Sequence, residues 1–234
     1  MPVHLYGSVV DIREIKKIIK KRKIFIIDDC AQAHGAKDDK GRKVGSLADI
    51  STFSLYPGKN LGAYGDAGVI TTNNKSLYEK IRKIRNLGAE KKFRHEIIGM
   101  NSRLDSMQAL ILNYKLKDLT RLNQLRRKIA SEYNKKIINN KIKKIKYSKH
   151  SVFHQYVIIV KERKRLIEYL KRSQIQFGFH YPHAIHQLEV FKKIFKKKRF
   201  SNAEILAKYG ISIPINPLLT KKEVLYIINK LNSF

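Results

Sequence analysis

The stretch that decides the fold is IFIIDDCAQAHGA, residues 24–36. Its apolar part, Ile24 to Ile27, follows a basic break and predicts a short buried strand, which Asp28 and Asp29 end. In open α/β sheets, ligands bind at the carboxyl ends of strands. The two aspartates therefore stand where a binding site is expected.

The surrounding pattern predicts an α/β sheet covered by helices. A helix is expected over residues 11–22, where apolar side chains recur at helical spacing, and further strands at 50–55 and 68–72. A strand should precede that helix to complete a βαβ unit, and the sequence offers none. The large domain is therefore expected to be incomplete at its front edge.

The rest of the chain predicts a long helical region and then a small α+β domain. We expect a helix over 74–87, a helical stretch over 104–134 that bends or breaks near Lys117, and a polar linker over 135–149. Beyond the linker, expected strands lie at 152–160, 175–180 and 211–213, and expected helices at 163–172, 202–209 and 221–231. The predicted domains are residues 1–134 and 135–234.

The composition excludes several classes of protein. A single cysteine, Cys30, excludes a disulfide framework and a multi-cysteine zinc site. No apolar run approaches the ~20 residues of a transmembrane helix. The first residues carry neither a basic region nor an apolar core, so they predict no signal peptide. A cytoplasmic protein is expected.

The net charge of +31 first suggests a polyanion as partner. The lysines are spread along the whole chain, however, and only 141–149 and 196–199 form clusters, so an AT-rich coding bias is the simpler explanation. The sequence contains no helix-turn-helix, zinc-finger or RNA-recognition pattern. We therefore expect no specific nucleic acid and no membrane as partners, although the charge would attract phosphorylated substrates.

Asp29 and Lys59 are the candidate chemical groups. A carboxylate at the end of a buried strand is costly without a cationic partner such as a protonated pyridine nitrogen. Taken by itself, however, Asp29 is more simply explained as a turn or capping aspartate. Lys59 lies among small and apolar residues, after a predicted strand that ends near Ser54. In such a pocket a lysine loses its proton readily and forms a Schiff base, whereas an ordinary loop lysine is solvated. The glycines of this loop allow its backbone to approach a phosphate.

Several motifs together resemble the DegT-type (also DnrJ and StrS) sugar aminotransferases, which are pyridoxal-phosphate enzymes of fold type I. The resemblance covers nearly the whole chain and is most specific around Lys59. It rests on the stretches PVHLYG (2–7), DCAQAHGA (29–36), FSLYPGKNLGAYGDAG (53–68), RHEIIGMNSRLDSMQA (94–109), FHQY (153–156), HYP (180–182) and IPINPL (213–218). It implies a three-layer α/β/α large domain, incomplete at its N-terminus, and a small C-terminal α+β domain.

The resemblance assigns a cofactor role to four residues of the first domain. Lys59 matches the lysine that binds pyridoxal phosphate covalently and then acts as the base. Asp29 matches the partner of the pyridine nitrogen, and Gln32 the residue beside the ring's 3-hydroxyl group. Ser54 matches a ligand of the cofactor phosphate.

Three further residues match positions that are less certain in their role. Asn101 matches a phosphate contact that comes from the other subunit in this family, which implies a homodimer. His180 and Tyr181 match the side of the site that binds the nucleotide-linked sugar, although packing within the small domain explains them equally well. No metal ligand is implied.

The implied reaction moves an amino group from an amino acid, usually L-glutamate, to a keto group of a nucleotide-linked sugar. The spellings HEIIG and HLYG look most like members that act on dTDP-keto-6-deoxysugars, and the product would feed surface-glycan or deoxyaminosugar synthesis. A sugar dehydratase on the same fold is disfavoured, because those enzymes typically have histidine where this chain has Lys59.

The chain departs from the family pattern mainly at its front. Family members carry roughly one small domain more, ~100 residues, before the point where this chain starts. The sequence therefore predicts an N-terminally truncated member: an enzyme, or alternatively a non-catalytic fragment, a pseudogene product or a split-enzyme subunit that a separate chain completes. Asp28 stands where the family usually has glutamate, and Cys30 where it usually has alanine.

Overall fold

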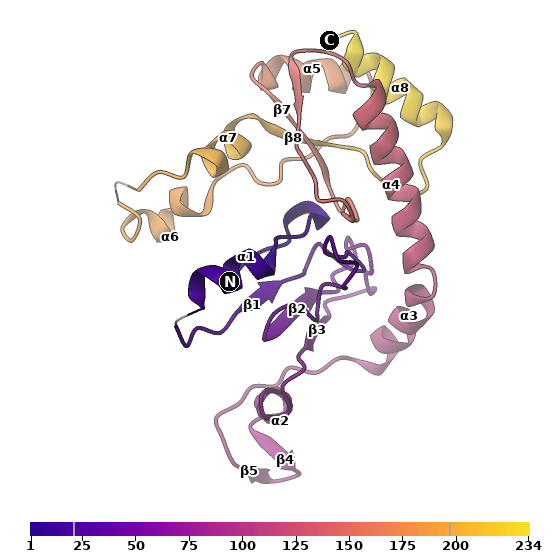
Figure 1. Cartoon of the computed structure of the whole chain (residues 1–234). Coiled ribbons are helices and arrows are strands. Elements are labelled where there is room, and N and C mark those ends of the chain that lie inside the picture. Colours follow the sequence, from indigo (N-terminus) through magenta and orange to yellow (C-terminus); the bar gives the residue numbers. More distant parts are fainter. Residues whose placement is uncertain (21, 197) are drawn as a thin grey trace. The chain divides into compact units, whose positions relative to one another are not determined.

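A computed structural model describes residues 1–20, 22–196 and 198–234. Lys21 of the expected first helix and Lys197 of the basic cluster at 196–199 lie outside the described residues. The chain, coloured along its sequence in Figure 1, divides into two compact units. The first unit comprises Met1–Gln124 and Tyr147–His154, and the second comprises Leu125–Lys146 and Gln155–Phe234. The expected domain boundary between residues 134 and 135 stays a prediction.

The first unit contains a mixed sheet of three strands in the order β1-β2-β3 (Figure 1). Strand β1 (Ile27–Asp29) runs parallel to β2 (Ile50–Ser54), and β3 (Gly68–Thr71) runs antiparallel to β2. In this register Asp29 lies opposite Thr52. The carboxyl ends of β1 and β2 therefore meet at one edge of the sheet, where ligands bind in this class of fold.

The expected buried strand Ile24 to Ile27 is wrong in two respects. Strand β1 begins only at Ile27, and Ile26 alone is buried, with 4% of its surface exposed. Phe25 is 73% exposed, and Ile24 and Ile27 are also exposed to solvent in the described part of the chain. The apolar core behind β1 is instead built from small and branched side chains: Ile12, Ile26, Cys30, Ala33, Ala36, Val44, Leu47 and Val152.

Helices and a small hairpin complete the first unit. The expected break near Lys117 is confirmed, because one helix ends just before it and the next begins just after it. The hairpin was not predicted, since its strands are too short and too polar to give a periodic pattern. The elements are the 3₁₀ turn η1 (Leu5–Gly7), α1 (Ile12–Ile19), α2 (Lys75–Ile84), β4 (Ala89–Lys91), β5 (Arg94–His95), α3 (Ser106–Leu116) and α4 (Leu119–Lys136), whose C-terminal part belongs to the second unit.

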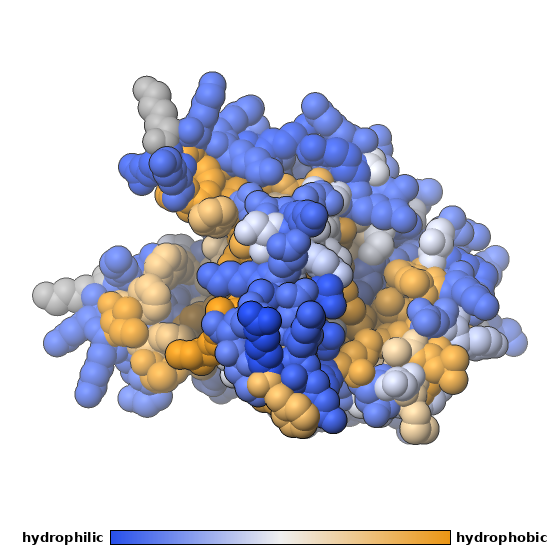
Figure 2. Space-filling model, turned by 90° about the horizontal axis from the view of Figure 1, so that it is seen from below, coloured by the Kyte–Doolittle hydropathy of each residue, from blue (hydrophilic) through white to orange (hydrophobic). Residues whose placement is uncertain are grey.

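Helix α3 leaves most of its apolar side chains in solvent. Met107, Leu110 and Tyr114 lie on one face by their spacing and are 72%, 72% and 74% exposed. Only Leu112 of this helix is buried. Figure 2 shows one face of the whole molecule, on which apolar residues, in orange, gather in several patches. Exposed apolar patches of this kind mark surfaces that bind another protein.

The second unit contains an antiparallel sheet in the order β6-β7-β8, with helices packed beside it (Figure 1). The expected strand at 175–180 is wrong: the described backbone forms there a single bridge, between Gly178 and Ser212. The expected linker at 135–149 contains the first strand of this sheet. The elements are β6 (Ile142–Lys144), β7 (Tyr156–Val160), α5 (Arg163–Arg172), η2 (Ile185–Gln187), α6 (Glu189–Lys192), α7 (Ser201–Tyr209), β8 (Gly210–Ile213) and α8 (Lys221–Asn232).

Membrane crossing needs a long apolar helix, and none of the helices in the described part of the chain meets that requirement.

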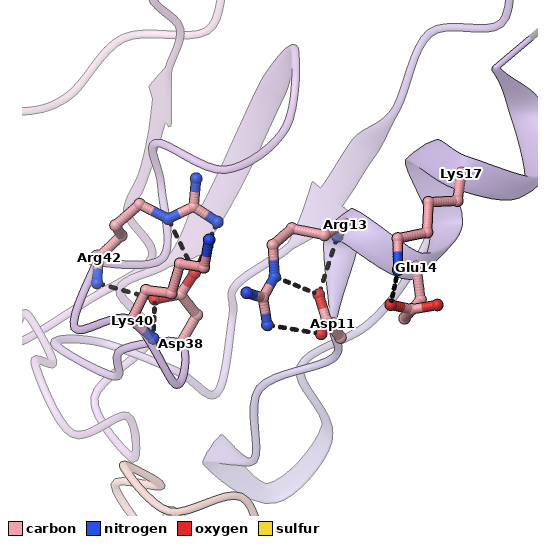
Figure 3. A network of polar contacts seen from close by, with 7 residues as sticks. All are labelled: Asp11, Arg13, Glu14, Lys17, Asp38, Lys40 and Arg42. Atoms are coloured by element: carbon pink, nitrogen blue, oxygen red, sulfur yellow. Dashed lines mark hydrogen bonds and ion pairs between the residues drawn. The ribbon is translucent and has the colours of Figure 1, made fainter.

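Local polar contacts fix the start of α1 (Figure 3). Asp11 is the N-cap: its Oδ1 accepts the backbone N–H of Arg13 at 2.9 Å, and the Arg13 guanidinium donates to both carboxylate oxygens. The hydrogen bond from Arg13 is the main cause that lowers the pKa of Asp11 to about 2. A turn elsewhere in the unit uses the same device, since Asp38 accepts the backbone N–H groups of Lys40 and Arg42.

Replacement of the N-cap gives a first prediction. Asp11→Ala should lower the free energy of unfolding by about 1 kcal/mol, because an orphan N–H of α1 loses its acceptor. Asp11→Asn keeps the cap and loses only the exposed ion pair with Arg13, so it should cost less than about 1 kcal/mol. Urea unfolding at neutral pH measures both. An equal loss for the two variants would assign the effect to the ion pair.

The stability difference between the wild type and Asp11→Asn is expected to depend on pH. The pKa of Asp11 in the folded chain, about 2, lies below its ordinary value of 3.8, so the charged form stabilises the fold above that value. The contribution is lost as the pH falls toward 2. The stability difference between the wild type and Asp11→Asn should therefore vanish in that window, as urea unfolding between pH 5 and about 2 can measure.

Candidate functional site

The sheet places two predicted site residues at its carboxyl edge. Asp29 is the last residue of β1 and Ser54 the last of β2, and both are half-buried. Asp29 Oδ1 accepts the backbone N–H of Ala31 at 2.9 Å, which fixes the direction of the carboxylate. Ser54 Oγ accepts weakly from the backbone N–H of Tyr56 at 3.5 Å.

Lys59 lies close enough to Asp29 for their charges to interact. Burial lowers the pKa of the Lys59 ammonium, and the negative charge of Asp29 opposes this effect without cancelling it. Lys59 is half-buried in a loop between β2 and β3. A lysine in this setting has a larger neutral fraction than a surface lysine and is a better nucleophile.

A tight loop presents Lys59. The loop is closed where Leu55 accepts the backbone N–H of Ala63 at 2.8 Å, and the N–H of Lys59 itself is bonded to Tyr56 O at 2.9 Å. Gly62 is required at its position, because an added Cβ would lie 2.4 Å from the Pro57 carbonyl oxygen. The glycines that the sequence placed in this loop therefore serve its geometry as well as any approach to a ligand.

Asn60, the residue after Lys59, ties the loop to the rest of the first unit. Its Nδ2 donates to Asn123 Oδ1 at 2.9 Å and to Val152 O at 3.1 Å, and its Oδ1 lies 3.1 Å from His154 Nδ1. Asn123 in turn donates to His34 O at 2.8 Å. Sequence reasoning missed Asn60, and only its place next to the reactive lysine pointed to it.

Gln32 and His34 are buried on the same loop that follows β1. Gln32 Oε1 accepts the backbone N–H of Tyr6, so its amide orientation is fixed. His34 is 3% exposed, and its ring nitrogens find no hydrogen-bond partner within the described part of the chain. Burial lowers the pKa of His34 to about 4, against the opposing effect of the Ser54 backbone and with a smaller contribution from the charge of Lys59, so the ring is neutral at physiological pH. Sequence reasoning missed His34, although a histidine within a run of small apolar residues was a signal.

The structure does not bring every predicted residue to this place. Asn101 is exposed and bridges to Asn86 beyond the end of α2, and among the described residues it makes no hydrogen bond with Lys59. His180 and Tyr181 belong to the second unit. There, His180 Nδ1 lies 2.8 Å from Ser212 Oγ and its ring lies edge-on to the half-exposed ring of Tyr181.

Comparison with known proteins gives consistent matches. The DegT/DnrJ/EryC1/StrS aminotransferase family matches residues 1–232. A protein of Aneurinibacillus thermoaerophilus named dTDP-3-amino-3,6-dideoxy-alpha-D-galactopyranose transaminase is 42% identical over 236 residues. A protein of Geobacillus stearothermophilus named pleiotropic regulatory protein is 39% identical over 241 residues. Each match covers 100% of this chain and 64% of the relative, so the chain spans just under two thirds of these relatives' length.

Solved structures show the same likeness. The crystal structure of DesV from S. venezuelae matches with a TM-score of 0.93 and 32% identity, over 99% of this chain and 63% of that one. An aminotransferase of the same family from Brucella abortus matches with a TM-score of 0.92 and 29% identity, again over 99% of this chain and 63% of the other. The predicted fold type I of the pyridoxal-phosphate enzymes is confirmed.

Pyridoxal phosphate is the cofactor of this group of proteins. The donor set of the first unit fits it: a lysine with a lowered pKa, a carboxylate at the strand end, a fixed amide and a hydroxyl group lie on neighbouring loops.

Removal of the Asn60 amide gives a second prediction. Asn60→Ala should lower the free energy of unfolding by about 1–3 kcal/mol, because Asn123 and His154 would lose a partner in a largely buried place. Asn113→Ala, at an exposed position of α3, is the matched control and should change it by less than about 0.5 kcal/mol. Chemical denaturation measures both. Equal effects would show that the Asn60 contacts do not hold the loop.

Proposed function

Because the chain belongs to the DegT/DnrJ/EryC1/StrS aminotransferase family, we propose that it is a pyridoxal-phosphate-dependent aminotransferase of nucleotide-linked sugars. The observation that carries the proposal is the half-buried Lys59, whose pKa is lowered by burial beside the Asp29 carboxylate. The amino donor is an amino acid, L-glutamate in our proposal. The acceptor is a keto-6-deoxysugar on dTDP, and the product serves surface-glycan or deoxyaminosugar synthesis in the cytoplasm.

Four residues of the first unit would hold the cofactor. Lys59 would bind it covalently, Asp29 would accept a hydrogen bond from its ring nitrogen, Gln32 would donate to its 3-hydroxyl oxygen, and Ser54 would bind its phosphate. Asn101 of a second subunit would add a phosphate contact. Pyridoxal phosphate, when bound, supplies the electron sink for amino-group transfer.

The lowered pKa of Lys59 suits both of its proposed tasks. A neutral Nζ is required for attack on a carbonyl carbon and for taking a proton as general base, and burial increases the neutral fraction. The Asp29 carboxylate prevents the pKa from falling further, so the amine can also return the proton. Efficient proton transfer needs a pKa near the working pH, and burial, as the larger of the two effects, moves the pKa of Lys59 in that direction.

The proposed substrate rests on the relatives and on charge. The Aneurinibacillus thermoaerophilus relative, named for a dTDP-linked amino sugar, is 42% identical to this chain. The net charge of +31 attracts an anionic nucleotide diphosphate to the molecule. His180 and Tyr181 are proposed to face this substrate, and the donor role of glutamate is carried over from the family.

Replacement of Lys59 gives a third prediction. The wild-type chain incubated with pyridoxal phosphate and reduced with borohydride should carry the label on Lys59, and Lys59→Ala should lose it. Asp29→Asn should keep the label and lower the rate of amino transfer by about 10²–10³, the usual effect of removing one electrostatic partner. Peptide mapping by mass spectrometry and a stopped amino-transfer assay measure these effects.

The matched control is Lys75→Ala, at an exposed position at the start of α2. It should leave the label on Lys59 unchanged. Label scattered over surface lysines in the wild type, or retained in Lys59→Ala, would contradict the assignment of the cofactor lysine.

We further propose that a second copy of this chain covers the exposed apolar face of α3. Met107, Leu110 and Tyr114 form an apolar stripe that the described residues of the first unit leave largely exposed, and Asn101 lies just before this helix. A dimer formed through this face would bury the stripe and bring the partner's Asn101 toward the interface. The alternative is that a separate chain covers this face. Such a chain would correspond to the part of each relative, about a third of its length, that this chain does not match.

Sedimentation equilibrium tests the dimer as a fourth prediction. The wild type should sediment as a dimer, and Leu110→Asp should weaken self-association at least about tenfold, because a charge would be buried in an apolar contact. Leu218→Asp is the matched control, since Leu218 is 76% exposed in the second unit, and it should leave the dimer intact. A wild type that is monomeric at all concentrations would exclude the second copy and leave the separate chain.

A further inference from the structure

The segment of residues 2–7 runs beside the end of β1. Val3 forms a parallel bridge with Asp29, in which the Asp29 N–H donates to Pro2 O at 2.9 Å and the His4 N–H donates to Asp29 O at 3.0 Å. On its other side β1 pairs with β2. The end of β1 is thus flanked by backbone hydrogen bonds on both sides, and those on one side come from the first residues of the chain.

The His4 side chain is fixed in one tautomer. The imidazole is fully buried, and its Nδ1 accepts the backbone N–H of Val10 at 3.0 Å. A ring nitrogen that accepts carries no proton, so Nε2 holds the hydrogen and donates it to Asp28 Oδ2 at 3.1 Å. His4 is therefore a neutral connector between the backbone of one segment and the carboxylate of another.

Asp28 is the charged half of this buried pair. Burial acts to raise the pKa of its carboxyl group, but the hydrogen bond from His4 and further polar neighbours outweigh it, so the pKa lies below its ordinary value. The side chain is fully buried, whereas that of Asp29 is half-exposed. Successive side chains of a strand point to opposite faces, so Asp28 faces the core and Asp29 faces the site.

His4, Asp28 and Cys30 offer ligand atoms within 4.8 Å of one another, which raises the question of a metal ion. Both nitrogens of His4 are already engaged by Val10 and Asp28. Burial also raises the pKa of the Cys30 thiol, so the sulfur stays protonated. The cluster therefore joins segments of the protein by hydrogen bonds.

The same segment also orients Gln32. The backbone N–H of Tyr6 donates to Gln32 Oε1, which fixes the orientation of the amide. Tyr6 and Gly7 both have positive φ angles, 59° and 85°. A Cβ at Gly7 would lie 2.8 Å from Val152 Cγ2 and 3.0 Å from Gln32 O, so this turn requires glycine at position 7.

We propose that His4 and Asp28 are positioning residues, which hold the end of β1 so that Asp29 and Gln32 meet the cofactor in the required geometry. This inference rests on the proposed function for the identity of the ligand. Neither His4 nor Asp28 touches the cofactor in this proposal. Both act through the backbone of Asp29, and the turn that carries His4 also fixes the amide of Gln32.

Two pairs of variants test the proposal. Asp28→Ala removes the acceptor of the His4 bond, whereas Asp28→Asn keeps an acceptor oxygen at the same place and should largely restore the wild-type behaviour. His4→Ala removes the connector, and Leu47→Ala, in the same apolar core and 6% exposed, removes a comparable volume without a polar contact. The first readout is amide hydrogen exchange of residues 28–32 in the full chain without cofactor. The second is the dissociation constant of pyridoxal phosphate.

His4→Ala and Asp28→Ala should lower the protection of residues 28–32 about tenfold beyond the effect of Leu47→Ala, and weaken cofactor binding about tenfold or more. Asp28→Asn should stay within about threefold of the wild type in both. Protection and binding that fall equally in His4→Ala, Asp28→Ala and Leu47→Ala would overturn the proposal. A wild type that fails to bind the cofactor would contradict the proposed function alone, because the exchange measurement needs no ligand.

Discussion

The first unit depends on one constraint: a lysine amine and a carboxylate must be held near each other, partly out of water, without collapsing into an ion pair. Burial lowers the pKa of Lys59 and the charge of Asp29 raises it, yet no ion pair joins the two in the described part of the chain. Separate hydrogen bonds keep them apart. Ala31 holds the Asp29 carboxylate, and Asn60 anchors the backbone next to Lys59. A direct salt bridge would keep the amine protonated and leave it without nucleophilic character.

This arrangement needs contributions from segments that lie far apart in the sequence. The side chain of Asn60 forms hydrogen bonds with Asn123, Val152 and the ring of His154. The segment of residues 2–7 forms backbone hydrogen bonds with the end of β1. For this reason Tyr147–His154 belongs to the first unit, although it follows the whole of α4 and strand β6 of the second unit in the sequence. Long-range polar contacts of this kind restrict the site more than the three-stranded sheet does by itself, because a small sheet with exposed apolar residues on its strands is weakly specified.

Sequence reasoning found the elements with strong patterns and the residues with specific chemistry. It located β2, the break near Lys117 and the helices at 163–172 and 221–231, because periodicity and caps act locally. It failed at Ile24 to Ile27, where apolar residues are exposed, because burial depends on what covers a strand and not on its composition. It also missed Asn60 and His34, since their roles come from contacts with residues that no spacing rule connects to them.

The excess of basic residues makes it informative that Asp29 forms no ion pair with another described residue. The chain has 50 lysine and arginine residues for 19 aspartate and glutamate residues, so cations are available near almost any surface carboxylate. Many of the acidic groups are indeed paired, as Asp11 and Asp38 are with neighbouring arginines. Asp29 makes no ion pair with another described residue, although it is half-exposed, and its one local bond is to a backbone N–H group. A carboxylate that stays unpaired among so many cations is kept so by the backbone that directs it. The Asp29 carboxylate is therefore suited to bind a cation from outside the chain, such as the protonated ring nitrogen of a bound cofactor.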